Sequence, residues 1–183
     1  ADSFNYDLDA WDTSRVTSMY AMFNGANIFN GKIGSWDVSE VTNMGYMFYS
    51  ASVFNQPIGQ WDVSKVTNIE YMFHSASVFN QPIAQWDVSK VTSLSHTFYK
   101  AFAFAQDLSI WTGSATETLQ TNMLSSATAF HAKYLCPDVS GGPLKWCVCK
   151  SECPASSPPP QLPKIVLTDA NIHSAIETCF YSN

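Results

Sequence analysis

Apolar and aromatic residues recur along the chain at a fixed interval of 25 residues, as Trp36, Trp61 and Trp86 do. The unit reads W-D-V-S-x-V-T-x-M-x-x-M-F-x-x-A-x-x-F-N-x-x-I-x-x, and its main columns persist over four or five copies. A period of this length is typical of repeat proteins, in which stacked units share one core. The residues expected to form this core ladder are Trp11, Trp36, Trp61, Trp86, Trp111, Phe23, Phe48, Phe73 and Phe98.

Each unit contains a candidate helix. Ile69, Met72, Phe73 and Ala76 stand at i, i+3, i+4 and i+7, which predicts about three turns of α-helix with one buried face. Thr67 is the expected N-cap and begins a T-x-x-E capping box.

The segment 83–88 alternates apolar and polar residues, which predicts a short β-strand with one buried face. Identical spacing implies that successive strands lie parallel and in register, about 4.8 Å apart. The expected fold class is therefore an α/β repeat solenoid, leucine-rich-repeat-like, with one short strand and one short helix per 25-residue coil. A recurrent asparagine at the bend after the helix is expected to satisfy turn backbone groups. This column comprises Asn5, Asn30, Asn55 and Asn80.

The pattern divides the chain into four regions. Residues 1–130 are expected to form about five coils, and aligning the last of them requires one inserted residue. Residues 131–155 are rich in cysteine and are expected to cap the end of the core. Residues 156–164 form a Pro-rich linker, and residues 165–183 form a short helical tail or the start of a further module.

The cysteine-rich region predicts covalent staples. Four cysteines, Cys136, Cys147, Cys149 and Cys153, lie close together. In an oxidising compartment such a cluster usually forms disulfides, and two bridges allow three pairings. A zinc site is the alternative, but the spacing lacks paired C-x2-C knuckles and the cluster contains no histidine. Cysteine usage therefore indicates a secreted or cell-surface protein, or one in an organelle lumen.

Composition argues against several function classes. Only 13% of residues are charged and the net charge is −6, so no basic stripe is present for nucleic acid. No apolar run approaches the roughly 18 to 20 residues that span a bilayer. The histidines show no metal-ligand spacing, and no phosphate loop or nucleophile elbow is present. The sequence therefore predicts no catalytic residues and no cofactor.

One polar column has two interpretations. Carboxylates stacked about 5 Å apart repel one another, so some interaction must offset their charge. Either each Asp accepts backbone N–H bonds in an Asx-type turn, or a ligand or a cation such as Ca²⁺ bridges neighbouring coils. The column comprises Asp12, Asp37, Asp62 and Asp87.

The variable column beside these aspartates is a second candidate surface, on the expected concave strand face. Such a face suits a protein or carbohydrate surface more than a small molecule. The main hypothesis is a non-catalytic binding or adhesion module, and the alternative is a structural or scaffolding subunit of a larger assembly, held through its Pro-rich tail and solenoid surface. The column comprises Ala10, Ser35, Gln60, Gln85 and Ile110.

The unit W-D-V-S-K-V-T-N-I-E-Y-M-F-H-S-A-S-V-F-N-Q-P-I, residues 61–83, resembles the BspA-like leucine-rich-repeat family. That family includes mycoplasma surface lipoproteins and repeat proteins of marine microalgae. The resemblance covers residue 4 to about residue 130. It implies a leucine-rich-repeat-like solenoid with a surface or adhesion role, and it carries over no catalytic residues.

Overall fold

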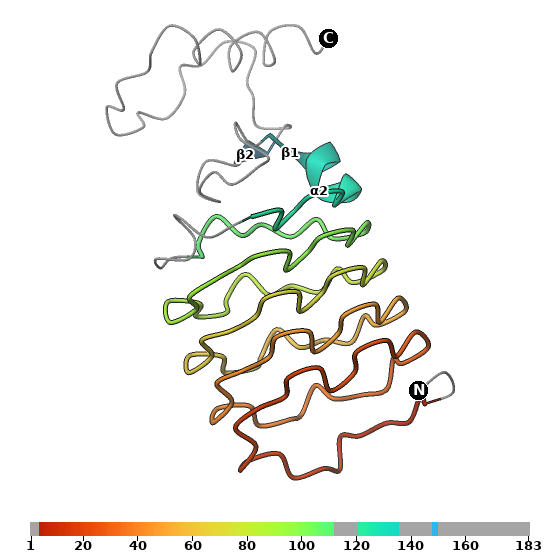
Figure 1. The fold of residues 1–183 in the computed structure, drawn as a ribbon, viewed down its shortest axis with the longest axis vertical. Coiled ribbons are helices and arrows are strands. Elements are labelled where there is room, and N and C mark those ends of the chain that lie inside the picture. Colours follow the sequence, from red (N-terminus) through yellow and green to blue (C-terminus); the bar gives the residue numbers. More distant parts are fainter. Residues whose placement is uncertain (1–3, 112–120, 136–147, 150–183) are drawn as a thin grey trace, which may run out of the picture.

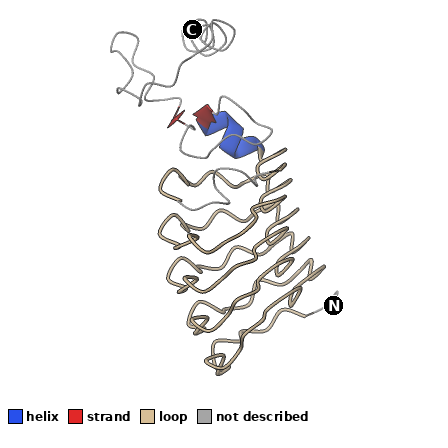
Figure 2. Cartoon of the chain, turned by 60° about the vertical axis from the view of Figure 1, so that its left-hand side comes forward, coloured by secondary structure: helices blue, strands red, loops and turns tan. Residues whose placement is uncertain are grey.

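The computed structural model describes residues 4–111, 121–135 and 148–149. The first range winds through successive coils that lie one on another (Figures 1 and 2). The first coil lies at one end of this stack, and three short elements lie at the other. These are α2 (Thr128–Lys133), β1 (Tyr134–Leu135) and β2 (Val148–Cys149), with β1 antiparallel to β2.

The predicted helix in each unit is wrong. Within residues 4–111 the chain forms no helix. Tandem turns occupy the segment where one was expected, which is residues 69–76 in the third coil, and we call it the tandem-turn segment. In these turns an N–H donates to the carbonyl three residues back, as from Met72 to Ile69 and from Ala76 to Phe73. Thr67 caps no helix, because its N–H and its hydroxyl both donate to the carbonyl of Thr42 in the preceding coil.

Two residues in each unit have a positive φ, which interrupts any helix. In the third coil they are Tyr71 and Ser75, with φ of 57° and 58°. A non-glycine residue in this conformation costs roughly 1–2 kcal/mol, so other contacts must hold it. The last pair lies one position further along the chain than the regular step requires, which confirms the single inserted residue. The positions are Ala21, Gly25, Tyr46, Ser50, Tyr71, Ser75, His96, Lys100, Asn122 and Ser126.

Hydrogen bonds between coils hold this backbone in place. The N–H groups of Tyr71, Phe73 and Ser75 donate to carbonyls of the next coil at 2.8–3.1 Å. Parallel bridges also join one coil to the next, as between Asn43 and Asn68. Parallel, in-register pairing is therefore present, but it lies in the segment that was expected to be helical.

The predicted strand at residues 83–88 is also wrong. Residues 83–86 form a turn closed by the Trp86 N–H and the Ile83 carbonyl, 3.1 Å apart. The alternation of burial is nevertheless as expected, since Trp86 and Val88 are buried while Asp87 is exposed.

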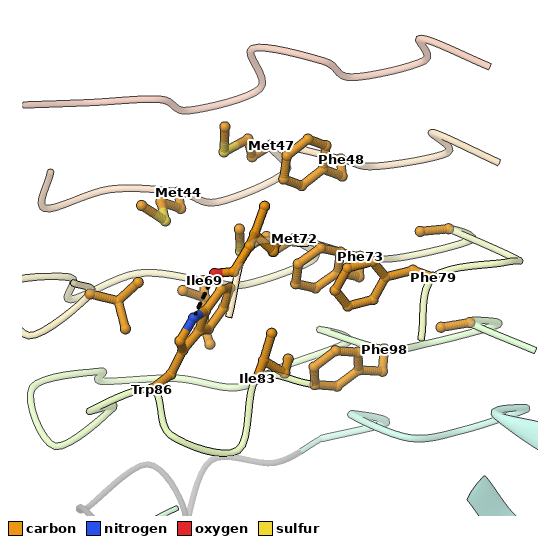
Figure 3. Packing of buried hydrophobic residues seen from close by; sticks show 14 of the residues in the cluster. Met44, Met47, Phe48, Ile69, Met72, Phe73, Phe79, Ile83, Trp86 and Phe98 are labelled. Atoms are coloured by element: carbon orange, nitrogen blue, oxygen red, sulfur yellow. Dashed lines mark hydrogen bonds between the residues drawn. The ribbon is translucent and has the colours of Figure 1, made fainter. Parts of the chain in front are cut away.

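The core ladders are confirmed, with one exception. Phe73 lies between Phe48 and Phe98, with ring centroids 5.6 and 5.5 Å away (Figure 3). The ladder tryptophans after the first are 3–4% exposed, and each indole N–H donates to a carbonyl of the preceding coil. Trp11 is 53% exposed because it belongs to the first coil.

The asparagine column confirms its structural prediction and adds a detail. Each side-chain Oδ1 accepts the backbone N–H of the equivalent residue in the next coil, so the amides satisfy backbone groups of the neighbouring coil and link one coil to the next. For example, the Asn80 N–H donates to the Asn55 Oδ1 at 2.9 Å. A glutamine follows the asparagine position in three coils and donates to the asparagine of the preceding coil, as Gln81 does to the Asn55 carbonyl.

Candidate binding surface

A face of stacked aromatic rings runs along the coils. It consists of two neighbouring columns of tyrosine and histidine, all partly exposed, which project from the tandem-turn segment. Within the columns, adjacent rings are stacked with centroids 4.5–4.8 Å apart. We call this surface the aromatic face. Its first column is Tyr46, Tyr71 and His96, and its second is Tyr49, His74 and Tyr99.

The local backbone explains why these rings point outward. Met72 and Phe73 are buried, so the residues on either side of this pair, Tyr71 and His74, lie on the outer side of the segment. Rings of the two columns also meet each other, since the Tyr71 and His74 centroids are 5.7 Å apart. The aromatic face is therefore continuous across both columns.

Because the rings stack on one another, their faces are largely covered. The surface consequently presents ring edges, phenol hydroxyls and imidazole nitrogens. Burial, followed by the neighbouring phenol of Tyr71, raises the pKa of Tyr46. The Tyr46 hydroxyl thus stays protonated at neutral pH and remains a hydrogen-bond donor.

His74 makes the aromatic face sensitive to acid. Its ring lies between Tyr49 and Tyr99, and burial, followed by the charge of His96, lowers the pKa of His74 below its ordinary 6.5. Below pH 6.5 the unfolded chain therefore binds more protons than the folded chain. The contribution of His74 to the free energy of unfolding is therefore largest above pH 6.5, and it decreases as the pH falls from 6.5 toward the lowered pKa of the folded state.

We therefore expect His74→Tyr to make the protein less sensitive to acid. Tyrosine occupies this column in both neighbouring coils, so the substitution keeps the stack and removes the titrating group. Thermal unfolding at pH 7.5 and pH 5.5 measures the effect, and the Tm of the wild type should fall further than that of the variant. Equal falls would show that His74 does not carry this pH dependence.

The aspartate column has the geometry of Asx-type turns. In each case the carboxylate accepts the backbone N–H of the serine two residues later at 3.0–3.1 Å. These hydrogen bonds from serine lower the pKa of all four aspartates, and repulsion between neighbouring aspartates is a smaller effect. The aspartates are Asp12, Asp37, Asp62 and Asp87.

No calcium cluster accompanies this column. Among the described residues, no group of three or more His, Cys, Asp or Glu side chains is placed to hold a metal ion. Most of the cysteine-rich cap and the whole of the linker and tail lie outside the described residues, as do the sulfur atoms of Cys136, Cys147, Cys149 and Cys153.

The variable column does not form a strand face. Ser35, Gln60 and Gln85 are exposed, but they lie in the turn that precedes each tryptophan. The Ser35 hydroxyl donates to the Asp9 carboxylate at 3.0 Å. The prediction missed the aromatic face because its columns mix Tyr and His, although the regular step of ring-bearing residues was visible in the sequence.

Comparison with known proteins identifies the family. The family model described as "Mycoplasma protein of unknown function, DUF285" matches residues 1–77 and 32–136. The chain belongs to the DUF285 family. Its matched segments include all the described coils and α2. No curated protein and no solved structure matches this DUF285 chain. Within the described part of the chain, no helix has the length and apolarity needed to cross a membrane.

Proposed function

We propose that this DUF285 chain is a non-catalytic, protein-binding module of a secreted or cell-surface protein, and that its aromatic face is the contact surface. The single observation that carries this proposal is the continuity of the two ring columns over three coils. A continuous surface of this kind suits an extended segment of another protein, because stacked repeats characteristically bind partners along their length.

The chemistry of the aromatic face favours polar contacts made from a rigid base. Each ring is held by its neighbours, so ligand binding costs little side-chain entropy. Phenol hydroxyls and imidazole nitrogens at the ring edges can donate to and accept from a polypeptide backbone. Tyrosine is also enriched at protein interfaces for its combination of apolar area and a polar tip.

The sequence resemblance supports the proposed location and role. The repeat unit resembles the BspA-like proteins, whose better-known relatives act in adhesion at cell surfaces. Membership of DUF285 is compatible with this role, and the low charge of the chain suits contact with a neutral partner.

The test removes the hydroxyls and keeps the rings. A chain carrying Tyr46→Phe, Tyr71→Phe and Tyr99→Phe should retain its stability and lose at least about tenfold in affinity, because each lost hydrogen bond contributes about 0.5–1.5 kcal/mol. Partners captured from membrane and matrix extracts by the wild type would be identified by mass spectrometry. Their affinities for both chains would then be measured by biolayer interferometry.

A matched control changes the aspartate column instead. Asp37→Asn, Asp62→Asn and Asp87→Asn together should leave partner affinity unchanged. If the aspartate variant loses binding while the phenylalanine variant keeps it, the proposed contact surface is wrong. Binding of the wild type to a glycan array, with no protein partner, would assign the ligand to carbohydrate.

A structural role in a larger assembly is the second candidate function. The Pro-rich segment that was expected to hold such an assembly lies outside the described residues.

A further inference from the structure

Four tyrosines with solvent-accessible side chains gather at the N-terminal end of the aromatic face. Tyr46 lies at their centre, and its ring centroid is 4.7 Å from that of Tyr71 and 5.6 Å from those of Tyr20 and Tyr49. Within the described part of the chain, Tyr46 takes part in every ring contact between two tyrosines. We call this group the tyrosine cluster.

Tyr46 and Tyr71 are the best-aligned pair in the tyrosine cluster. Their rings are inclined by only 13°, whereas the Tyr46 ring is inclined by 59° to that of Tyr20 and by 31° to that of Tyr49. The backbone N–H groups of Tyr46 and Tyr71 each donate to a carbonyl of the next coil, at 2.9 and 3.1 Å. The two stacked phenols are therefore held together by the fold.

Stacking between these coils does not itself require phenols. The buried rings of Phe48 and Phe73 stack between the same two coils, with centroids 5.6 Å apart. Tyr46 and Tyr71 differ from them in two ways, because their side chains are partly exposed and because a phenol loses an electron far more readily than a phenyl ring. An oxidant in the solvent can therefore reach and oxidise this pair, while burial and chemistry both protect the core pair.

Histidines separate the other tyrosines of the aromatic face. Tyr71 is followed in its column by His96, at 4.6 Å. In the second column, Tyr49 and Tyr99 lie on opposite sides of His74, at 4.5 and 4.8 Å. An imidazole is harder to oxidise than a phenol, so each histidine interrupts the run of oxidisable rings. Within the described columns, only the first therefore places two tyrosines directly against each other.

We propose that Tyr46 and Tyr71 form an oxidative modification site, at which a peroxidase with hydrogen peroxide joins the two rings covalently. Each phenol loses one electron and one proton and becomes a phenoxyl radical. The two radicals pair in a bond between one ortho carbon of each ring, and the hydrogen on each of these carbons then moves to the oxygen and restores the phenol. The hydrogen peroxide gains the two electrons and two protons and becomes two water molecules.

The fold favours this coupling over competing ones and gives it a mechanical consequence. Rings that already touch react as one molecule, so coupling within the chain outpaces coupling between chains. The bond links the second coil to the third and closes a loop between residues that are 25 apart in the sequence. Such a cross-link stabilises the folded state by restricting the unfolded chain.

The test treats the whole chain, at low concentration, with a peroxidase and a limiting amount of hydrogen peroxide. Mass spectrometry of a protease digest should find the peptides of Tyr46 and Tyr71 linked, with a mass two hydrogen atoms below their sum. This cross-link should form at least about tenfold faster than any other between tyrosines. The cross-linked chain should also melt about 5 °C or more above the untreated chain.

Matched variants locate the reaction. Tyr71→Phe keeps a ring in the stack and should abolish most of the dityrosine fluorescence, whereas Tyr99→Phe should leave it unchanged. His74→Tyr should add a second cross-link, from position 74 to Tyr49 or Tyr99, because it removes the interruption in the second column. Dityrosine formed in equal yield by Tyr71→Phe, cross-links found only between separate chains, or no new cross-link in His74→Tyr would each overturn the proposal that ring stacking directs the coupling.

Discussion

Replacing Phe73 with alanine is expected to lower the free energy of unfolding by about 3–5 kcal/mol. The Phe73 side chain is fully buried, and its ring centroid lies 4.0 Å from that of Phe79 and 5.6 and 5.5 Å from those of the two equivalent phenylalanines. Removing the ring leaves a cavity that the rigid lateral hydrogen bonds prevent from closing. Urea unfolding followed by circular dichroism measures the loss.

An exposed phenylalanine provides the control for this experiment. The side chain of Phe102 is 46% exposed, so Phe102→Ala should change the free energy of unfolding by no more than about 0.5 kcal/mol. If the two variants lose the same stability, the rings in the Phe73 column do not form the shared core.

The sequence predicted which side chains are buried far better than it predicted the backbone that buries them. Ile69, Met72, Phe73 and Ala76 are all buried, as the helical pattern required, although no helix is present in the described coils. The reason is that tandem turns with a left-handed residue at Tyr71 can direct the same four side chains inward. Burial follows from the spacing of apolar residues, and several backbones satisfy one spacing.

The backbone could not be predicted because its hydrogen bonds are not local. A helix satisfies each N–H from within its own segment, and patterns such as T-x-x-E identify that arrangement. Here the Tyr71 N–H donates to the carbonyl of Ser95, which belongs to the next coil. Only the presence of a neighbouring coil makes such a bond available, and no single unit encodes it.

Of the two candidate surfaces, the sequence predicted the geometry of the aspartate column but not the aromatic face. The Asx-type interpretation of the aspartates depends on residues two positions apart, and it agrees with the structure. The aromatic face was missed because its columns mix tyrosine with histidine; an α-helix would also have placed Tyr71 and His74, three residues apart, on its outer side. Once Tyr71 and His74 are known to share the outer side of their segment, the two ring columns follow from the repeat alone.

Replacing Asn55 with leucine is expected to lower the free energy of unfolding by about 1–3 kcal/mol, which is the cost of leaving a donor unpaired inside a protein. The Asn55 Oδ1 accepts the Asn80 N–H at 2.9 Å and the Gln81 Nε2 at 3.1 Å. Leucine has nearly the same shape but accepts no hydrogen bond, so both donors lose this partner. Urea unfolding gives the total loss, and hydrogen exchange at the Asn80 amide locates it.

Asn55→Asp separates the hydrogen bond from the shape of the side chain. Aspartate keeps an oxygen at the position of Oδ1, so this variant should retain most of the stability at pH 7 and preserve the protection of the Asn80 amide. Asn5→Leu, at the start of the same column, removes only an exposed acceptor for Asn30 and should cost less than Asn55→Leu. If aspartate and leucine at position 55 are equally destabilising, the column stabilises the coils through packing, and its role as a ladder of acceptors must be abandoned.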